Sequence, residues 1–131
     1  MTAFNPSEFL GTAQDLVEDE REAYLRTAVS RAYYAIFLLA RDAMAVTLRD
    51  GRAHRETRER LMAHKRRMGT QLSLLHGLRK MADYEVEKQL GRKRASNALN
   101  IARGLHCGLL RLKANSIRQG TRQQPSESVR P

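Results

Sequence analysis

The amino-acid sequence predicts an all-α domain, a bundle built from a handful of helices with short joints. Proline, the strongest helix breaker, occurs only at positions 6, 125 and 131, which leaves residues 7–124 free of it. Glycines at positions 51, 69, 91 and 120 punctuate that stretch. Within the resulting segments, apolar residues recur at the spacing that places them on one face of a helix.

The first helix is expected to begin near Asn5, Pro6 and Ser7, where a capping side chain and a first-turn proline belong. It should end near Glu18. A long second helix is predicted over about residues 20–48, with an alanine-rich apolar stripe. Since small side chains allow close approach of neighbouring helices, this element should be the spine of the bundle. Its stripe consists of Tyr24, Ala28, Ala32, Ala35, Ile36, Leu39, Ala43 and Val46.

Three further helices are predicted after Gly51. A basic helix over about residues 53–68 has few apolar residues and should be the least buried. The fourth starts near Thr70 and breaks or bends near Asp83 and Tyr84. The last covers about residues 96–118. We therefore expect a helical domain over residues 1–118 and a disordered basic tail over residues 119–131, which are rich in Gln, Ser and Pro.

The net charge of +10 is unevenly distributed along the chain. Residues 1–25 carry six acidic side chains against Arg21 alone, whereas residues 92–131 carry nine Lys or Arg against Glu127 alone. A basic surface attracts polyanions such as RNA. The same layout could instead let the acidic end of one copy dock on the basic end of another, or be an ordinary solvated surface.

Other bulk features exclude several classes of protein. No apolar run approaches the roughly 20 residues that a membrane span needs, and the N-terminus lacks the order of a signal peptide. Cys107 is the single cysteine, so an internal disulfide is impossible. These features predict a cytoplasmic protein with no membrane partner.

Two segments carry short motifs: residues 30–37 read SRAYYAIF and residues 78–84 read LRKMADY. They resemble the SRAYYAxF and LRxxADY signatures of the HEPN family of prokaryotic helical domains. With the flanking helices, the resemblance extends over about residues 5–118. It implies an antiparallel bundle of four to five helices that forms a homodimer through a two-fold interface.

The resemblance also implies a function. Many HEPN domains are metal-independent RNases, found as toxins paired with a nucleotidyltransferase antitoxin or in other prokaryotic defence systems. RNA or a nucleotide is therefore the implied ligand. The active members carry an Arg followed four to six residues later by a His, which act on the 2′-hydroxyl and the phosphate.

This sequence departs from that catalytic pattern. Leu38 stands where many relatives carry His, and Arg79 is followed by Asp83 and Tyr84 without a His at the required offset. Arg49 with His54 and Arg58 with His64 match the spacing, but so basic a chain produces about two such matches by chance. The sequence thus contains no credible Arg-His pair, and RNase activity stays uncertain. The catalytic candidates that remain are Arg79, Asp83 and Tyr84.

Ligand binding is assigned to Arg31, Tyr34, Arg79 and Tyr84. Arg31 is either a phosphate ligand facing Arg79 or a structural partner of a carboxylate such as Asp83. Arg79 and Asp83, four residues apart, could equally form a plain surface ion pair. The alternative function is a protein-interaction module that partners a nucleotidyltransferase or another effector without binding nucleic acid.

The four histidines suggest neither a metal site nor a cofactor. His54 and His64 lack an acidic or cysteine partner at a ligand spacing, and His106 cannot share a metal with Cys107 on one helix. His76 lies one turn before Arg79 and could join a cleft there, although a histidine on the helix surface is the more common case.

Overall fold

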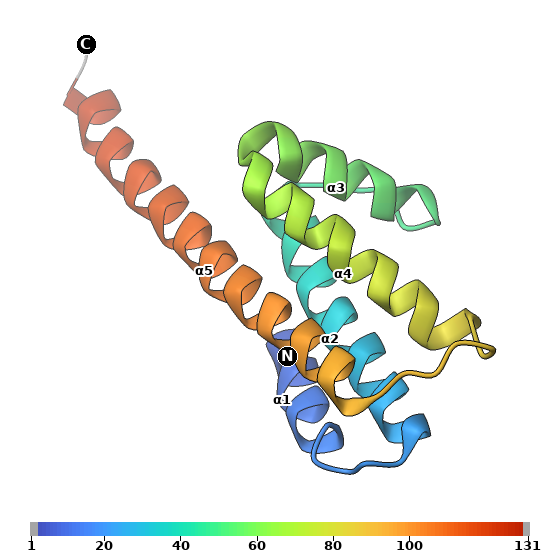
Figure 1. The fold of residues 1–131 in the computed structure, drawn as a ribbon. Helices are drawn as coiled ribbons and strands as arrows, with labels where there is room; N and C mark the ends of the chain where they lie inside the picture. Colours follow the sequence, from blue (N-terminus) through green and yellow to red (C-terminus); the bar gives the residue numbers. More distant parts are fainter. Residues whose placement is uncertain (1–2, 130–131) are drawn as a thin grey trace.

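The computed structural model describes the backbone of residues 3–129 and the side chains of residues 3–115. Five helices follow one another and form an all-helical bundle, as predicted (Figure 1). They are α1 (Ser7–Leu16), α2 (Glu22–Ala43), α3 (Arg52–His64), α4 (Arg66–Tyr84) and α5 (Arg92–Val129). The described range contains no β-strand.

Helix α2 is the spine of the bundle, because it contacts each of the other four helices. Ala28, Ala32, Ala35 and Ala40 have no exposed surface, so neighbouring helices pack directly against this small-residue stripe. Tyr24 departs from the prediction. It lies on the surface with 37% of its area exposed, and the Arg21 guanidinium carbon sits 4.0 Å from its ring centroid.

The end of α2 differs from the predicted position near Leu48. Ala45 adopts a left-handed backbone conformation with φ of 54°. The Ala45 N–H donates to the Asp42 carbonyl and the Val46 N–H to the Arg41 carbonyl, which is the hydrogen-bond pattern of a Schellman motif. Glycine usually occupies this left-handed position, so an alanine there gave no sequence signal for the helix end.

Helices α3 and α4 are separated by Lys65 alone, whose backbone is extended. Residues 66–68, predicted to end the third helix, belong to α4 instead. Gly69 marks the close crossing of the two helices rather than a joint between them. A Cβ at this position would lie 2.5 Å from the Cα of Met62 on α3.

Helix α5 is longer than predicted, running from Arg92 to Val129. Its buried side chains, among them Ala98, Leu99, Ala102 and Leu105, pack into the core as expected, whereas Leu110 keeps 48% of its surface exposed. The bounds of α5 include residues 119–129, for which the sequence predicts a disordered tail. Side chains in that segment lie outside the described range, and the division at residue 118 stays a prediction.

Arg26 of α2 fixes the C-terminal end of α4 against the spine. Its side chain, 13% exposed, donates hydrogen bonds to the carbonyls of Met81 and Ala82 at 3.1 and 2.9 Å, and also to those of Glu85 and Lys88. These acceptors include terminal carbonyls that the helix itself leaves unpaired. The end of α4 that carries Asp83 and Tyr84 is therefore held next to α2.

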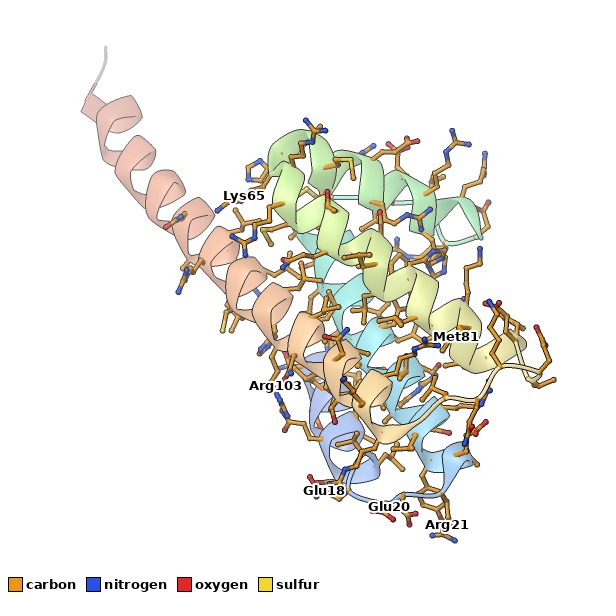
Figure 2. The ribbon with its side chains drawn as sticks, in the orientation of Figure 1. Glu18, Glu20, Arg21, Lys65, Met81 and Arg103 are labelled. Carbon is orange, nitrogen blue, oxygen red and sulfur yellow. The ribbon has the colours of Figure 1, made fainter. Side chains whose placement is uncertain are left out.

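Charges of opposite sign meet within one chain at the joint between α1 and α2. Arg92, the first residue of α5, lies 3.3 Å from a Glu18 oxygen and 3.7 Å from a Glu20 oxygen. Glu18, Glu20 and Arg21 gather at this end of the bundle, while Lys65 lies at the opposite end (Figure 2). The basic C-terminal segment thus neutralises part of the acidic N-terminal segment intramolecularly.

Candidate functional site

The two segments that resemble the HEPN signatures lie side by side in the fold, one on α2 and the other on α4. The Arg79 Nη2 donates a hydrogen bond to the Tyr34 hydroxyl at 2.6 Å. Ser30 also links the two helices, because its hydroxyl donates to Asp83 Oδ2 at 3.2 Å. Residues forty-five and fifty-three positions apart in the chain are thereby joined in one polar cluster.

Arg79 and Asp83 form an ion pair that is largely enclosed. The Arg79 Nε lies 2.9 Å from Asp83 Oδ2, and the two side chains are 13% and 26% exposed. Although this oxygen lies within ion-pair distance, the buried Nε forms no hydrogen bond within the described part of the chain. Arg79 and Asp83 are therefore a largely enclosed pair within α4, linked to α2 through Tyr34 and Ser30, rather than a plain surface pair.

Arg31 lies against the same tyrosine ring as Arg79. Its guanidinium carbon lies 5.1 Å from the Tyr34 ring centroid and 5.2 Å from that of Phe9. Arg79 also lies 5.1 Å from the Tyr34 centroid. Two cations thus lie near one ring, at distances typical of cation–π contacts. No carboxylate among the described residues forms an ion pair with Arg31, so the alternative of a structural carboxylate partner for it has no support.

Tyr84 completes the group of four residues assigned to binding. Its side chain is 68% exposed, and the Arg79 guanidinium carbon lies 5.4 Å from its ring centroid. The structure therefore brings Arg31, Tyr34, Arg79 and Tyr84 together. They form a surface cluster. Two hollows on the described surface, of about 710 and 820 Å³, are lined by other residues.

Next to this cluster lie two histidines that the sequence did not assign to it. His54 of α3 places Nδ1 2.6 Å from the Tyr33 hydroxyl and stacks on Phe37 with ring centroids 4.0 Å apart. His76 of α4 lies with its ring centroid 5.4 Å from Tyr33 and 5.9 Å from His54. His76 is only partly exposed. Its position one turn before Arg79 was the signal that could have identified it.

The surroundings of these histidines favour their neutral forms. Burial and the positive charges of Arg58 and other nearby cations lower the pKa of His76 to about 4. Burial, together with Arg79, Arg58 and Arg41, also lowers the pKa of His54. The pKa of the Tyr33 hydroxyl is raised by burial. At neutral pH, two uncharged imidazoles therefore lie beside the protonated hydroxyl of Tyr33. His54 can accept the Tyr33 hydrogen bond at Nδ1.

The described residues contain no group of three or more His, Cys, Asp or Glu side chains placed to hold a metal ion. Comparison of the chain with protein-family models, with curated proteins and with solved structures found no match. Among the described helices, none combines the length and the apolar character that crossing a membrane requires.

Proposed function

We propose that this protein is a HEPN-like helical domain that binds RNA or a nucleotide through Arg31, Tyr34, Arg79 and Tyr84. The observation that carries the proposal is the placement of the Arg31 and Arg79 guanidinium groups at 5.1 Å from the same Tyr34 ring. Asp83 compensates one of these two charges. The remaining positive charge, that of Arg31, lies against Tyr34, and the exposed ring of Tyr84 lies against Arg79 in the same cluster. An uncompensated cation and an exposed ring in one cluster are suited to a phosphate with a stacked base.

The four residues have different parts in this proposal. Arg31 is the phosphate ligand, because it is free of a carboxylate partner among the described residues. Tyr84 offers an exposed ring to a base. Tyr34 and Arg79 are mainly positioning residues, since Arg79 Nη2 bonds to the Tyr34 hydroxyl at 2.6 Å and the Arg79 charge is paired with Asp83.

The basic helix α3 adds less to RNA binding than its composition suggests. Three of its arginines are paired with carboxylates on the same helix or just before it. Arg52 lies 2.8 Å from Asp50, Arg55 lies 2.9 Å from Glu59, and Arg60 lies 2.8 Å from Glu56. Such a helix surface is closer to a solvated face than to a track for a nucleic-acid backbone.

The proposal is for binding, and catalysis is no part of it. Asp83 accepts from Ser30 and pairs with Arg79, which leaves it poorly suited to proton transfer. Other expectations from the resemblance, namely a homodimer, a nucleotidyltransferase partner and a role in toxin–antitoxin or defence systems, stay predictions. The cytoplasmic location, expected from the bulk features of the sequence, also stays a prediction.

The test is the salt dependence of binding to a single-stranded RNA oligonucleotide, measured by fluorescence anisotropy. Arg31→Gln should weaken binding and reduce the slope of log affinity against log salt by about one. Arg21→Gln is the matched control, because Arg21 also lies over a tyrosine but pairs with Asp19 at 2.7 Å. Equal losses in the two variants would refute the site. Association with a protein that salt does not affect would favour the interaction module instead.

A further inference from the structure

Positive charge is concentrated around His54 and His76 without matching negative charge. Arg41 of α2, Arg58 of α3, and Arg79 and Lys80 of α4 each act electrostatically on one or both imidazoles. Within the described residues, one carboxylate forms an ion pair with any of these four cations, namely Asp83, which pairs with Arg79. Holding like charges together opposes folding, so a cluster of this kind is a candidate for ligand binding.

Arg58 has an unused donor in this cluster. Its Nη1 is buried and has no hydrogen-bond acceptor among the described residues. Leaving a buried donor unpaired costs about 1–3 kcal/mol, and more when the group is charged. Arg58 follows His54 by one helical turn and so lies on the same face of α3. A ligand with acceptor oxygens would remove this cost.

We propose that His54, Arg58 and His76 bind a tetrahedral dianion, chemically a phosphate monoester or inorganic phosphate. A guanidinium group matches the oxygens of a phosphate in a two-pronged arrangement. Each imidazole supplies an N–H donor, and a second one when it takes up a proton. The three side chains come from α3 and α4 and lie around Tyr33 of α2, whose hydroxyl touches His54.

Anion binding at this site is coupled to proton uptake. The groups that face the two histidines are Tyr33 and Arg41 on α2, Arg58 on α3, and Arg79 and Lys80 on α4, with Asp83 behind Arg79. Four of these are cations that disfavour a charged imidazole. A bound dianion cancels their effect and stabilises the imidazolium form, so binding raises the pKa of both histidines. Affinity for the anion therefore increases as the pH falls below neutral.

This site is separate from the Arg31 contact and does not depend on RNA binding. Its residues lie on α3 and α4 around Tyr33, whereas Arg31 lies against Tyr34 and Phe9. Loss of RNA binding in Arg31→Gln would leave it unchanged. Failure of one proposal can thus be distinguished from failure of the other.

The first experiment follows the histidine ring Cε1–H resonances by NMR as the pH is varied, with and without sulfate. Sulfate is the probe because it keeps both negative charges throughout the titration, so a pH-dependent effect belongs to the protein. We expect sulfate to raise the apparent pKa of His54 and His76 and to leave His64, at the exposed end of α3, unchanged. Equal shifts at all three histidines, or no shift at His54 and His76, would overturn the proposal.

The second experiment measures the binding of inorganic phosphate by calorimetry to wild type, Arg58→Gln and Arg55→Gln. Arg55 lies on the same helix with 80% of its side chain exposed and is the charge-matched control. We expect about a tenfold or larger loss of affinity in Arg58→Gln, consistent with one charge-assisted contact. An equal loss in Arg55→Gln would assign binding to general charge and contradict the site.

A third measurement distinguishes the sources of the phosphate group. A dinucleotide with a 5′-phosphate is compared with inorganic phosphate and with the same dinucleotide carrying a 5′-hydroxyl. Tighter binding of the phosphorylated dinucleotide would identify a nucleotide end as the source, and affinity equal to that of inorganic phosphate would identify the free ion. Equal binding of the 5′-hydroxyl form would show recognition of a diester and overturn the assignment to a dianion.

Discussion

The Tyr33 hydroxyl lies 2.6 Å from Nδ1 of His54 and joins the second helix of the bundle to the third. Tyr33 itself has no exposed surface, so its hydroxyl needs a partner, and His54 provides one. The neighbouring residue, Tyr34, bonds to Arg79 of the fourth helix. Two adjacent tyrosines thus connect α2 to two different helices, and the candidate sites lie on either side of them.

The lowered pKa of His76 predicts a loss of stability in acid. The folded protein binds this proton with a pKa of about 4, and the unfolded chain with a pKa of 6.5. The unfolded state therefore takes up the proton first as the pH falls. The free energy of unfolding should decrease between pH 6.5 and about 4. In His76→Gln this decrease should be smaller, as measured by urea unfolding at a series of pH values.

The control for that experiment is His64→Gln, which removes an exposed histidine at the end of α3. Its pH profile should follow that of wild type. Parallel profiles for wild type and His76→Gln would show that His76 titrates alike in the folded and unfolded chain.

Replacement of Tyr34 by Phe should destabilise the fold by about 1–2 kcal/mol, because Arg79 Nη2 loses its acceptor in a partly buried position. Urea unfolding measures the change. The comparison is Tyr84→Phe, which deletes the same atom from a side chain that is 68% exposed and should cost almost nothing. If both substitutions leave stability unchanged, the link between Tyr34 and Arg79 contributes nothing to the fold.

Asp83→Asn should move stability and RNA affinity in opposite directions. Loss of the carboxylate leaves the largely enclosed Arg79 guanidinium uncompensated, at a cost of about 1–2 kcal/mol for a pair that is still partly exposed. The freed positive charge should tighten RNA binding several-fold. Asp42→Asn, an equal change of charge at an exposed position, is the control. A decrease in both quantities would indicate that the Asp83 carboxylate itself contacts the RNA.

The crossing of α3 and α4 predicts opposite effects for two glycines on the same helix. Gly69→Ala places a methyl group 2.5 Å from the Met62 Cα, so the helices must separate, and a loss of about 1–3 kcal/mol is expected. Gly77→Ala meets nothing within 4 Å and should stabilise α4 by up to about 1 kcal/mol through helix propensity. Thermal unfolding of the two variants measures both. Equal destabilisation would contradict this geometry.

Most of the helices could be predicted from the sequence because apolar spacing and the absence of proline are local signals. Their ends were harder to predict. Ala45 closes α2 in a conformation that glycine usually adopts, and Lys65 separates α3 from α4 with neither a proline nor a glycine at the break. In both places tertiary packing overrides the local preference, so a single sequence carries no signal.

The candidate site was predicted in part for a similar reason. Arg31, Tyr34, Arg79 and Tyr84 belong to two short motifs, and the structure brings them together. His54 has no partner at a ligand spacing in the sequence. Its partners are Tyr33 and Phe37, which are brought to it when α3 folds back against α2. Such contacts between helices are determined by how the helices pack, and the spacing of residues in the sequence does not reveal them.

The most direct measurement for the central claim is the response of the tyrosine ring resonances to single-stranded RNA in NMR spectra. We predict that the ring signals of Tyr34 and Tyr84 shift on addition of RNA. Tyr24 should remain unchanged, although it too is exposed and lies under an arginine. A shift of Tyr24 equal to that of Tyr34, or spectra in which neither Tyr34 nor Tyr84 responds, would contradict RNA binding at this cluster.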